Sequence, residues 1–134
     1  MKIIKWNPDL AVGIEEIDDD HKKLLGCMND LFIACYAGQG PAVIQKTLSS
    51  LKLFSREHFT REENTMHDLG FPELEAHRSL HDLLLAELDR LNQELEDGSN
   101  HEISNKTLKF LEDCLLQHII LEDMKIGHFI PAST

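Results

Sequence analysis

Aromatic residues with polar groups are scarce in this 134-residue chain, which has one tryptophan and one tyrosine, and there are only four prolines and seven glycines. The prolines and glycines sit in short clusters, so the stretches between them can form long helices. No apolar run reaches the roughly 18 residues that suggest a membrane-spanning helix. Residues Met1 to Trp6 also lack the long apolar region of a signal peptide, so we expect neither a membrane segment nor a leader.

Basic residues are also few, since 13 lysines and arginines face 24 acidic residues and the formal net charge is −11. Nucleic-acid affinity depends mainly on Lys and Arg neutralising phosphates, so we expect no nucleic-acid partner. The same charge argues against docking on an anionic membrane. The three cysteines have no metal-like spacing and are odd in number, so we expect reduced thiols in a cytoplasmic protein.

Four segments of the chain have apolar residues at helical spacing, and no useful length alternates as a strand would. We expect helices from about 19 to Tyr36, from Pro41 to about Met66, from beyond Pro72 to about Glu96, and from about 104 to Ile126. Asp18, Asp19 and Asp20 are N-cap candidates for the first helix, and Ser104 or Asn105 for the fourth.

Short connections between four helices imply antiparallel neighbours. The predicted fold is therefore all-α, an up-down-up-down antiparallel four-helix bundle forming a single domain over residues 1–134. Each helix has one apolar stripe, of which the third is the cleanest, with Leu84, Leu88, Leu91 and Leu95. Residues 1–17 have no clear period, and we expect them to form an arm lying on the bundle of residues 18–134.

Histidine and acidic residues occupy positions in these stripes where leucine would be expected. They are His21 in the first stripe, His58 and Glu62 in the second, His77 and His81 in the third, and His118 in the fourth. A buried, unpaired imidazole or carboxylate is costly, so such groups must satisfy one another or bind something. One histidine on an apolar face is ordinarily a satisfied core residue, but five on four facing stripes favour a ligand site.

The spacing of these residues predicts where their side chains lie. The pairs His58 with Glu62 and His77 with His81 are four residues apart, so each pair shares a helix face. In an ideal α-helix Asp123, five residues after His118, is rotated about 140° away, but from the helix end it could reach sideways. Antiparallel order brings all seven groups to one level of the bundle.

Seven ligands exceed the four that a structural zinc takes, so they suit two metal ions. Imidazole suits iron, copper and zinc, and carboxylates readily bridge hard ions. Two octahedral irons have about twelve coordination positions, of which five imidazoles, two bridging carboxylates and a shared oxygen fill all but one. That open position is where a diatomic ligand would bind.

This arrangement of ligands resembles the hemerythrins and bacteriohemerythrins over nearly the whole chain. The resemblance includes the ligand order, Val12-Gly13-Ile14, Ile17-Asp18 before His21, the pair Glu62-Glu63 and the segment Gly70-Phe71-Pro72. It implies two iron ions per chain with an oxide or hydroxide bridge. His77, His81 and His118 would hold the saturated iron, His21 and His58 the open one, and Glu62 and Asp123 would bridge them. The residues implied to line a dioxygen pocket are Leu24, Phe59, Leu115 and Ile119.

The function implied by the resemblance is reversible dioxygen binding by an oxygen carrier, storage or delivery protein, not an enzyme. A reductase or an oxygen-consuming enzyme is a further expected partner, and we expect a monomer. The alternative is a di-iron redox enzyme or a sensor that handles peroxide or nitric oxide. Ferritin-like di-iron enzymes use Glu-x-x-His motifs, and this sequence contains none.

One position departs from the family pattern. Four residues before the fourth-helix histidine the family often has tryptophan, whereas this chain has Cys114. We hypothesise that, with that aromatic volume lost beside the pocket residue Leu115, Cys114 also lines the pocket and loosens access to the open iron. The alternative is that a neighbouring methionine or leucine fills the space and the change is silent. His67, His101 and His128 fall outside the ligand pattern and are expected to have surface or incidental roles.

Overall fold

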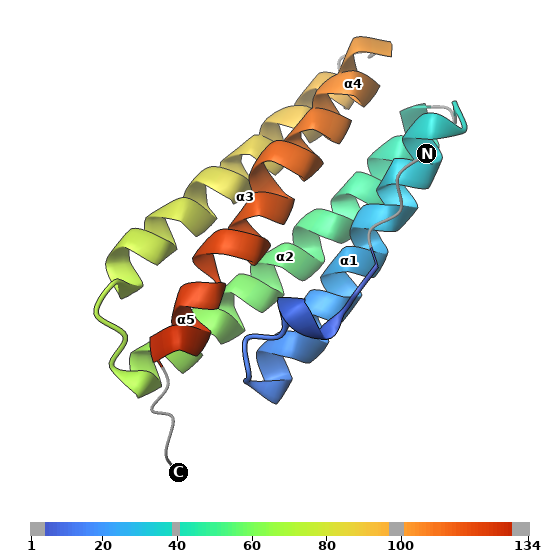
Figure 1. Ribbon diagram of the computed structural model, residues 1–134. Coiled ribbons are helices and arrows are strands. Elements are labelled where there is room, and N and C mark those ends of the chain that lie inside the picture. The colour runs from blue at the N-terminus through green and yellow to red at the C-terminus, as the bar shows by residue number, and fades with distance from the viewer. Residues whose placement is uncertain (1–4, 39–40, 97–100, 130–134) are drawn as a thin grey trace.

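The computed structural model describes residues 5–38, 41–96 and 101–129, and its long helices run side by side in alternating directions (Figure 1). There is no strand among these residues, so the predicted all-α antiparallel four-helix bundle is confirmed. The elements are η1 (Pro8–Leu10), α1 (Glu15–Tyr36), α2 (Pro41–Leu69), α3 (Leu74–Glu96), and a fourth helical segment made of α4 (His101–Phe110), η2 (Leu111–Leu116), η3 (His118–Glu122) and α5 (Met124–Phe129). None of the described helices is long and apolar enough to cross a membrane.

The main core is formed by the apolar stripes of the four helices, as their period predicted. Leu24, Leu48, Leu88, Leu91 and Leu111 are inaccessible to solvent and belong to one contiguous cluster. Complete burial of a leucine side chain contributes about 1.5–3 kcal/mol, so these contacts dominate the stability of the bundle. The core occupies the middle of the bundle and leaves one end to a different set of side chains.

A smaller apolar cluster closes that other end. It contains Val12 from the arm, Ile17 from α1, Met66 from α2, Phe71 from the α2–α3 connection and Ile126 from α5. The start of α1, the α2–α3 connection and α5 lie at the same end of the bundle (Figure 1). The cluster therefore separates solvent from the polar groups described below.

Two helix starts differ from those predicted. The first helix begins at Glu15, and Asp18 lies in its first turn with its carboxylate accepting hydrogen bonds from the backbone N–H groups of Val12 and Gly13 at 2.7 and 3.2 Å. The fourth begins at His101, so Ser104 and Asn105 lie within α4. At the first helix Ile17 packs in the apolar cluster at that end of the bundle, and a cap contributes only about 1 kcal/mol against such packing.

The α2 helix ends where predicted to within three residues, at a glycine in the left-handed region. Gly70 has a φ of 70°, and the N–H of Phe71 donates to the carbonyl oxygen of Met66 at 2.9 Å. This bond closes a Schellman motif, which needs a residue with positive φ just beyond the helix. The turn aims the chain back so that α3 starts beside the end of α2.

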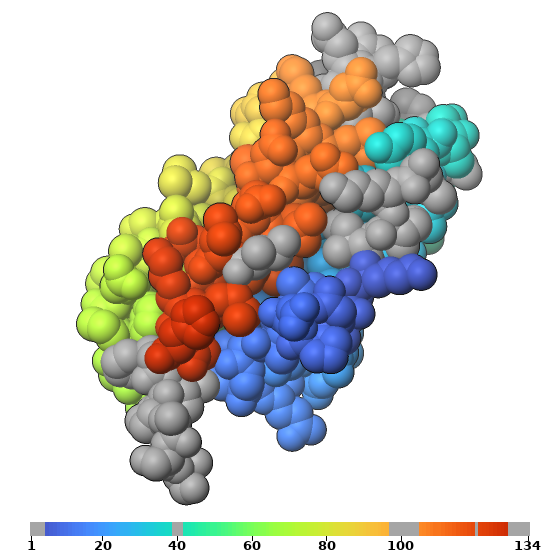
Figure 2. Space-filling model, viewed as in Figure 1, coloured from blue at the N-terminus to red at the C-terminus, as the bar shows by residue number. Residues whose placement is uncertain are grey.

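The arm of residues 5–14 lies against the bundle, with Trp6 and Leu10 packed on the main core. Figure 2 shows the arm, in dark blue, beside the red end of the chain. The contact is tight at Gly127 in α5, where an added Cβ atom would lie 2.3 Å from the carbonyl oxygen of Val12. Glycine is therefore the only residue that allows this approach without a shift of backbone.

Gly127→Ala is expected to displace the arm and lower the free energy of unfolding by about 1–3 kcal/mol, as overpacking typically does. Gly26→Ala is a matched control, since Gly26 lies in α1 with no atom within 4 Å of its added Cβ, and it should stabilise the helix by about 0.5–1 kcal/mol. Urea unfolding of both variants measures the difference. Equal effects of the two substitutions would contradict the tight contact.

Candidate metal centre

The seven side chains predicted as ligands come together at the closed end of the bundle, and each is 5% exposed or less. They form two overlapping groups whose ligand atoms lie within 4.8 Å of one another. Glu62 and Asp123 belong to both groups. The other members come from every helix: His21 from α1, His58 from α2, His77 and His81 from α3, and His118 from η3.

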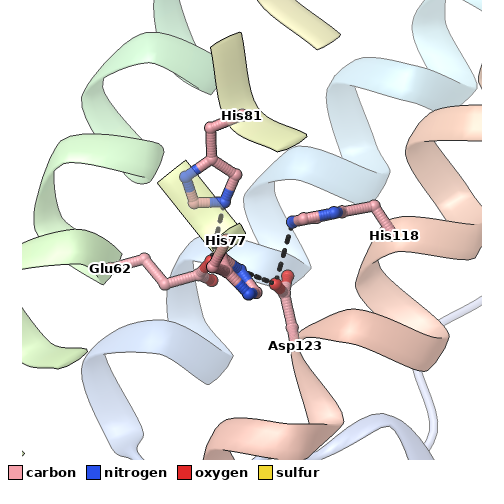
Figure 3. A group of neighbouring side chains, drawn as sticks. All are labelled: Glu62, His77, His81, His118 and Asp123. Atoms are coloured by element: carbon pink, nitrogen blue, oxygen red, sulfur yellow. Dashed lines mark hydrogen bonds and ion pairs between the residues drawn. The ribbon is translucent and has the colours of Figure 1, made fainter. Parts of the chain in front are cut away.

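Three imidazoles, those of His77, His81 and His118, lie around Oε1 of Glu62 and Oδ1 of Asp123 (Figure 3). The Oε1 atom of Glu62 lies 2.9 Å from His77 Nε2 and 3.0 Å from His81 Nε2. The Oδ1 atom of Asp123 lies 2.9 Å from His77 Nε2 and 3.0 Å from His118 Nε2. We call this set of three imidazoles and two oxygens the three-histidine side.

The remaining two imidazoles face the other carboxylate oxygens. The Oε2 atom of Glu62 lies 3.1 Å from His58 Nε2 and 3.4 Å from His21 Nε2, and Asp123 Oδ2 lies 3.0 Å from His21 Nε2. We call this set the two-histidine side. Each carboxylate thus has one oxygen close to members of the three-histidine set and the other close to members of the two-histidine set, as a group that bridges two cations would.

Several of these buried atoms have no hydrogen-bond partner among the described residues, although oppositely charged groups are near. They are Nε2 of His21, His58, His81 and His118, Oε2 of Glu62 and Oδ2 of Asp123. These atoms lie close together but are misaligned for hydrogen bonds with one another, as ligand atoms directed at a shared ion would be. Buried polar groups without partners are costly, and imidazole with carboxylate is a suitable donor set for iron. The residues present therefore fit a metal site.

The backbone of the fourth helical segment explains how Asp123 reaches the site. Both η2 and η3 are π-helical, and the N–H of Asp123 donates to the carbonyl oxygen of His118 at 3.1 Å. A π-helical turn places residues five apart almost above one another. The expectation that Asp123 is turned about 140° away was wrong, since it assumed ideal α-helix. No sideways reach is needed.

Burial and charge pull the titration of the cluster in opposite directions. Burial alone would lower the pKa of His21 and of His77, but the carboxylates of Asp123 and Glu62 outweigh it and raise each to about 9. Burial raises the pKa of Glu62, yet its contacts with His21, His58, His77 and His81 hold it well below its usual range. In the metal-free cluster at neutral pH, His21 and His77 are therefore protonated beside the two carboxylates.

Two carboxylates outside the predicted ligand set contact the histidines from behind. Asp20 Oδ2 accepts from Nδ1 of His58 at 3.0 Å, and Glu63 Oε2 accepts from Nδ1 of His81 at 2.8 Å. Sequence reasoning missed both roles: Asp20 was taken as a capping residue, and Glu63 was noted only as part of a pair. The available signal was an acidic residue directly beside a predicted ligand.

The predicted pocket residues divide into two sets. Leu24, Phe59, Leu115 and Ile119 are buried, and the Phe59 ring stacks on His81 with ring centroids 3.9 Å apart. Cys114 does not join them, because it is exposed. The prediction that it lines the interior pocket was therefore wrong.

Cys114 lines an outer groove of about 700 Å³ between α3 and the fourth helical segment. Leu84 and Phe110 lie in its buried floor, and His118 also borders it. A thiol is too small to fill the space between the helices, so the groove stays open to solvent there.

The histidines outside the ligand pattern do not contact the cluster where the structure describes them. His67 is exposed and lies near Asp68, and His128 is exposed on α5. The side chain of His101 lies outside the described part of the structure. The surface role predicted for the first two agrees with their exposure.

Comparison with known proteins gives a consistent result. Residues 12–130 match the family profile described as Hemerythrin HHE cation binding domain. The bacteriohemerythrin of Stenotrophomonas maltophilia is 27% identical over 98% of this chain and 84% of its own length, and that of Methylococcus capsulatus is 27% identical over 98% and 100%. Two solved structures, leucine-to-phenylalanine and leucine-to-tyrosine mutants, the second described as a hemerythrin, each cover 96% of this chain with a TM-score of 0.81 and 25% identity.

The stability of the metal-free protein should fall as pH rises from about 6.5 to 9. The pKa of His21 and His77 is about 9 in the folded state, above the unfolded value of about 6.5. The stabilisation from these groups is complete below the unfolded pKa and is lost as pH rises through the folded one. Urea unfolding of chelator-treated protein across this range measures the slope, which His21→Gln should reduce. Stability that rose with pH would contradict the assignment.

Deletion of Leu121 should leave metal binding intact. It shortens the spacing from His118 to Asp123 to four residues, which an α-helical turn places on one face just as the π-helical turn does for five. Leu121 is exposed, so little packing is lost. The matched control is deletion of Leu83, an exposed leucine in α-helical α3, which rotates His81 relative to the core and should abolish binding. Metal content after dialysis distinguishes the two, and loss in both would refute the π-helical explanation.

Proposed function

Since the chain belongs to the hemerythrin family, we propose that it binds dioxygen reversibly at a pair of iron ions held by the seven clustered side chains. The observation that supports this most directly is the unequal division of the five imidazoles into a group of three and a group of two, which share Glu62 and Asp123. Two equivalent metal sites would need an even division. The unequal one leaves one site with fewer donors.

The donor count on each side supports the proposal. The three-histidine side offers three imidazoles and two carboxylate oxygens, and the two-histidine side offers two and two. With a shared oxide or hydroxide, these sets would offer about six and five donors, so an iron held on the two-histidine side would keep one position free for a ligand. The iron held by the two-histidine side would supply electrons to a diatomic ligand and would bind it at this free position.

The surroundings of the site favour a carrier over an enzyme. Leu24, which lies one helical turn from His21, and Leu115 and Ile119 are buried and apolar. Such side chains exclude water and offer no proton donor to a bound ligand. They suit a small apolar molecule that is bound and released unchanged, whereas turnover of an organic substrate would need polar groups to orient it.

The expected partners follow from this role. Dioxygen is the ligand, and a reductase would return oxidised iron to the reduced state. An oxygen-consuming enzyme is the proposed recipient if the protein delivers what it binds. We propose that the carrier acts as a cytoplasmic monomer.

The protein purified with iron should contain two irons per chain and should bind dioxygen with a change in visible absorption that reverses under vacuum. Glu62→Ala removes a bridging group between two cations and should lose both irons. His67→Ala, which alters an exposed histidine, should keep both. Metal analysis together with absorption spectra before and after air exposure provides the measurement.

Two outcomes would count against the proposal. A single tightly bound zinc without visible absorption would rule out the iron pair. Consumption of a reductant over many turnovers without a stable oxygenated form would favour the redox-enzyme alternative instead.

A further inference from the structure

We infer that Asp20 and Glu63 are positioning residues, each of which selects the tautomer of one histidine and thereby supports one of the two metal ions. Asp20 acts on His58, of the two-histidine side, and Glu63 acts on His81, of the three-histidine side. The inference rests on the proposed function only in taking the cluster to hold two metal ions. It assigns roles to residues outside the seven candidate ligands.

Asp20 is part of a chain of hydrogen bonds that runs from Arg61 at the surface to His58 on the two-histidine side. We call such an arginine–carboxylate–histidine chain a relay. Arg61 donates from Nε to Asp20 Oδ2 at 2.8 Å and from Nη2 to Asp20 Oδ1 at 2.9 Å. The same Oδ2 atom accepts from His58 Nδ1 at 3.0 Å. Asp20 is buried at 6% exposure, whereas Arg61 reaches solvent. The paired guanidinium keeps the carboxylate ionised and fixed in place.

The second relay consists of Arg78, Glu63 and His81, and it joins the next pair of helices. Arg78 donates from Nε to Glu63 Oε1 at 3.0 Å, and Glu63 Oε2 accepts from His81 Nδ1 at 2.8 Å. Asp20 lies on α1 and its histidine on α2, while Glu63 lies on α2 and its histidine on α3. The two relays therefore join successive helix pairs and end on opposite sides of the shared carboxylates.

The chemistry of the neutral imidazole ring connects these contacts to metal binding. A carboxylate only accepts hydrogen bonds, so the ring nitrogen facing it must carry the proton. The proton then sits on Nδ1, and Nε2 keeps the lone pair that a metal needs. In both histidines Nε2 is the atom that faces Glu62, at 3.1 Å in His58 and 3.0 Å in His81.

The contrast with His21 shows that such support is selective. Its Nδ1 atom is buried without a hydrogen-bond partner among the described residues. His58 is thus the one imidazole on the two-histidine side whose ring is oriented from behind by a carboxylate. Loss of Asp20 should weaken that side alone, and loss of Glu63 the other.

Asp20→Asn and Glu63→Gln test the inference, since each keeps the shape of the side chain but introduces an amide N–H₂ that can donate to Nδ1. We expect part of the His58 population in Asp20→Asn, and of His81 in Glu63→Gln, to shift to the tautomer protonated on Nε2. Long-range ¹H–¹⁵N correlation spectra of the metal-free protein at mildly alkaline pH report each tautomer directly. A purely structural role would not move these signals.

Zinc(II) is the probe for the metal step, because it is diamagnetic and does not depend on redox chemistry. In each variant one of two binding events should weaken by about 10–100-fold, the usual effect of losing such a partner. In Asp20→Asn the first equivalent of zinc should shift the imidazole ¹⁵N signals of His77, His81 and His118 and leave those of His58 unchanged. In Glu63→Gln it should shift those of His21 and His58.

Asp19→Asn is the matched control for Asp20→Asn, because Asp19 is the exposed neighbour of Asp20 in the chain. Glu75→Gln is the matched control for Glu63→Gln, because Glu75 is an exposed carboxylate that also pairs with Arg78. Both should bind zinc as the wild type does. Unchanged tautomers in Asp20→Asn and Glu63→Gln would overturn the inference, as would equal weakening of both binding events in each variant. Failure of the iron protein to bind dioxygen would refute the proposed function without affecting these readouts.

Discussion

The structure depends on the burial of two carboxylates, Glu62 and Asp123, at the centre of one end of the bundle. The effective penalty for taking a carboxylate out of water is several kcal/mol, so each needs positive charge beside it. Five imidazoles contact them, and without metal the positive charge comes from groups such as His21 and His77, whose pKa is raised to about 9. Every helix must reach this centre because no single helix face can present so many ligands at once. The bundle is in effect built around its least apolar region.

The fourth helical segment shows how the backbone adapts to this demand. Long π-helical stretches are rare, and they cost hydrogen-bond geometry that α-helix would retain. Here η2 and η3 are tolerated because Leu111, Leu115 and Ile119 keep their core contacts through the distorted turns. The gain is that His118 and Asp123 share one face. An α-helical segment with the same sequence could direct only one of them to the cluster.

Sequence reasoning succeeded where a repeating pattern carried the information. The period of apolar residues located the four helices, and histidines within that period, such as His21 and His81, identified the site. It failed where the deciding contact was between residues distant in the chain. Asp20 resembled a helix cap because its partners, His58 and Arg61, are about forty residues away and on another helix. Its position directly before His21 is the one local feature that distinguishes it from Asp19.

Two further errors concern the directions of single side chains in the fourth helical segment. Asp123 was included among the ligands, but its direction was misjudged because helical period was taken as uniform, although a single wide turn changes the register of everything beyond it. Cys114 was placed in the pocket because the family often has tryptophan at this position, beside the pocket residue Leu115, yet a small residue at a helix interface can leave an outer groove instead. Periodicity gives the average direction of a side chain, and packing decides the individual case.

Each carboxylate in and around the site has positive charge to balance it once the two relays are included. Four carboxylates are involved: Glu62 and Asp123 inside, Asp20 and Glu63 behind the histidines. Arg61 and Arg78 neutralise the outer two from the surface, where a guanidinium keeps its hydration while forming hydrogen bonds inward. The inner pair has no arginine or lysine partner in the described structure and is left to imidazolium or metal. The outer charges are thus balanced permanently, and the inner charges remain available for cations that bind and leave.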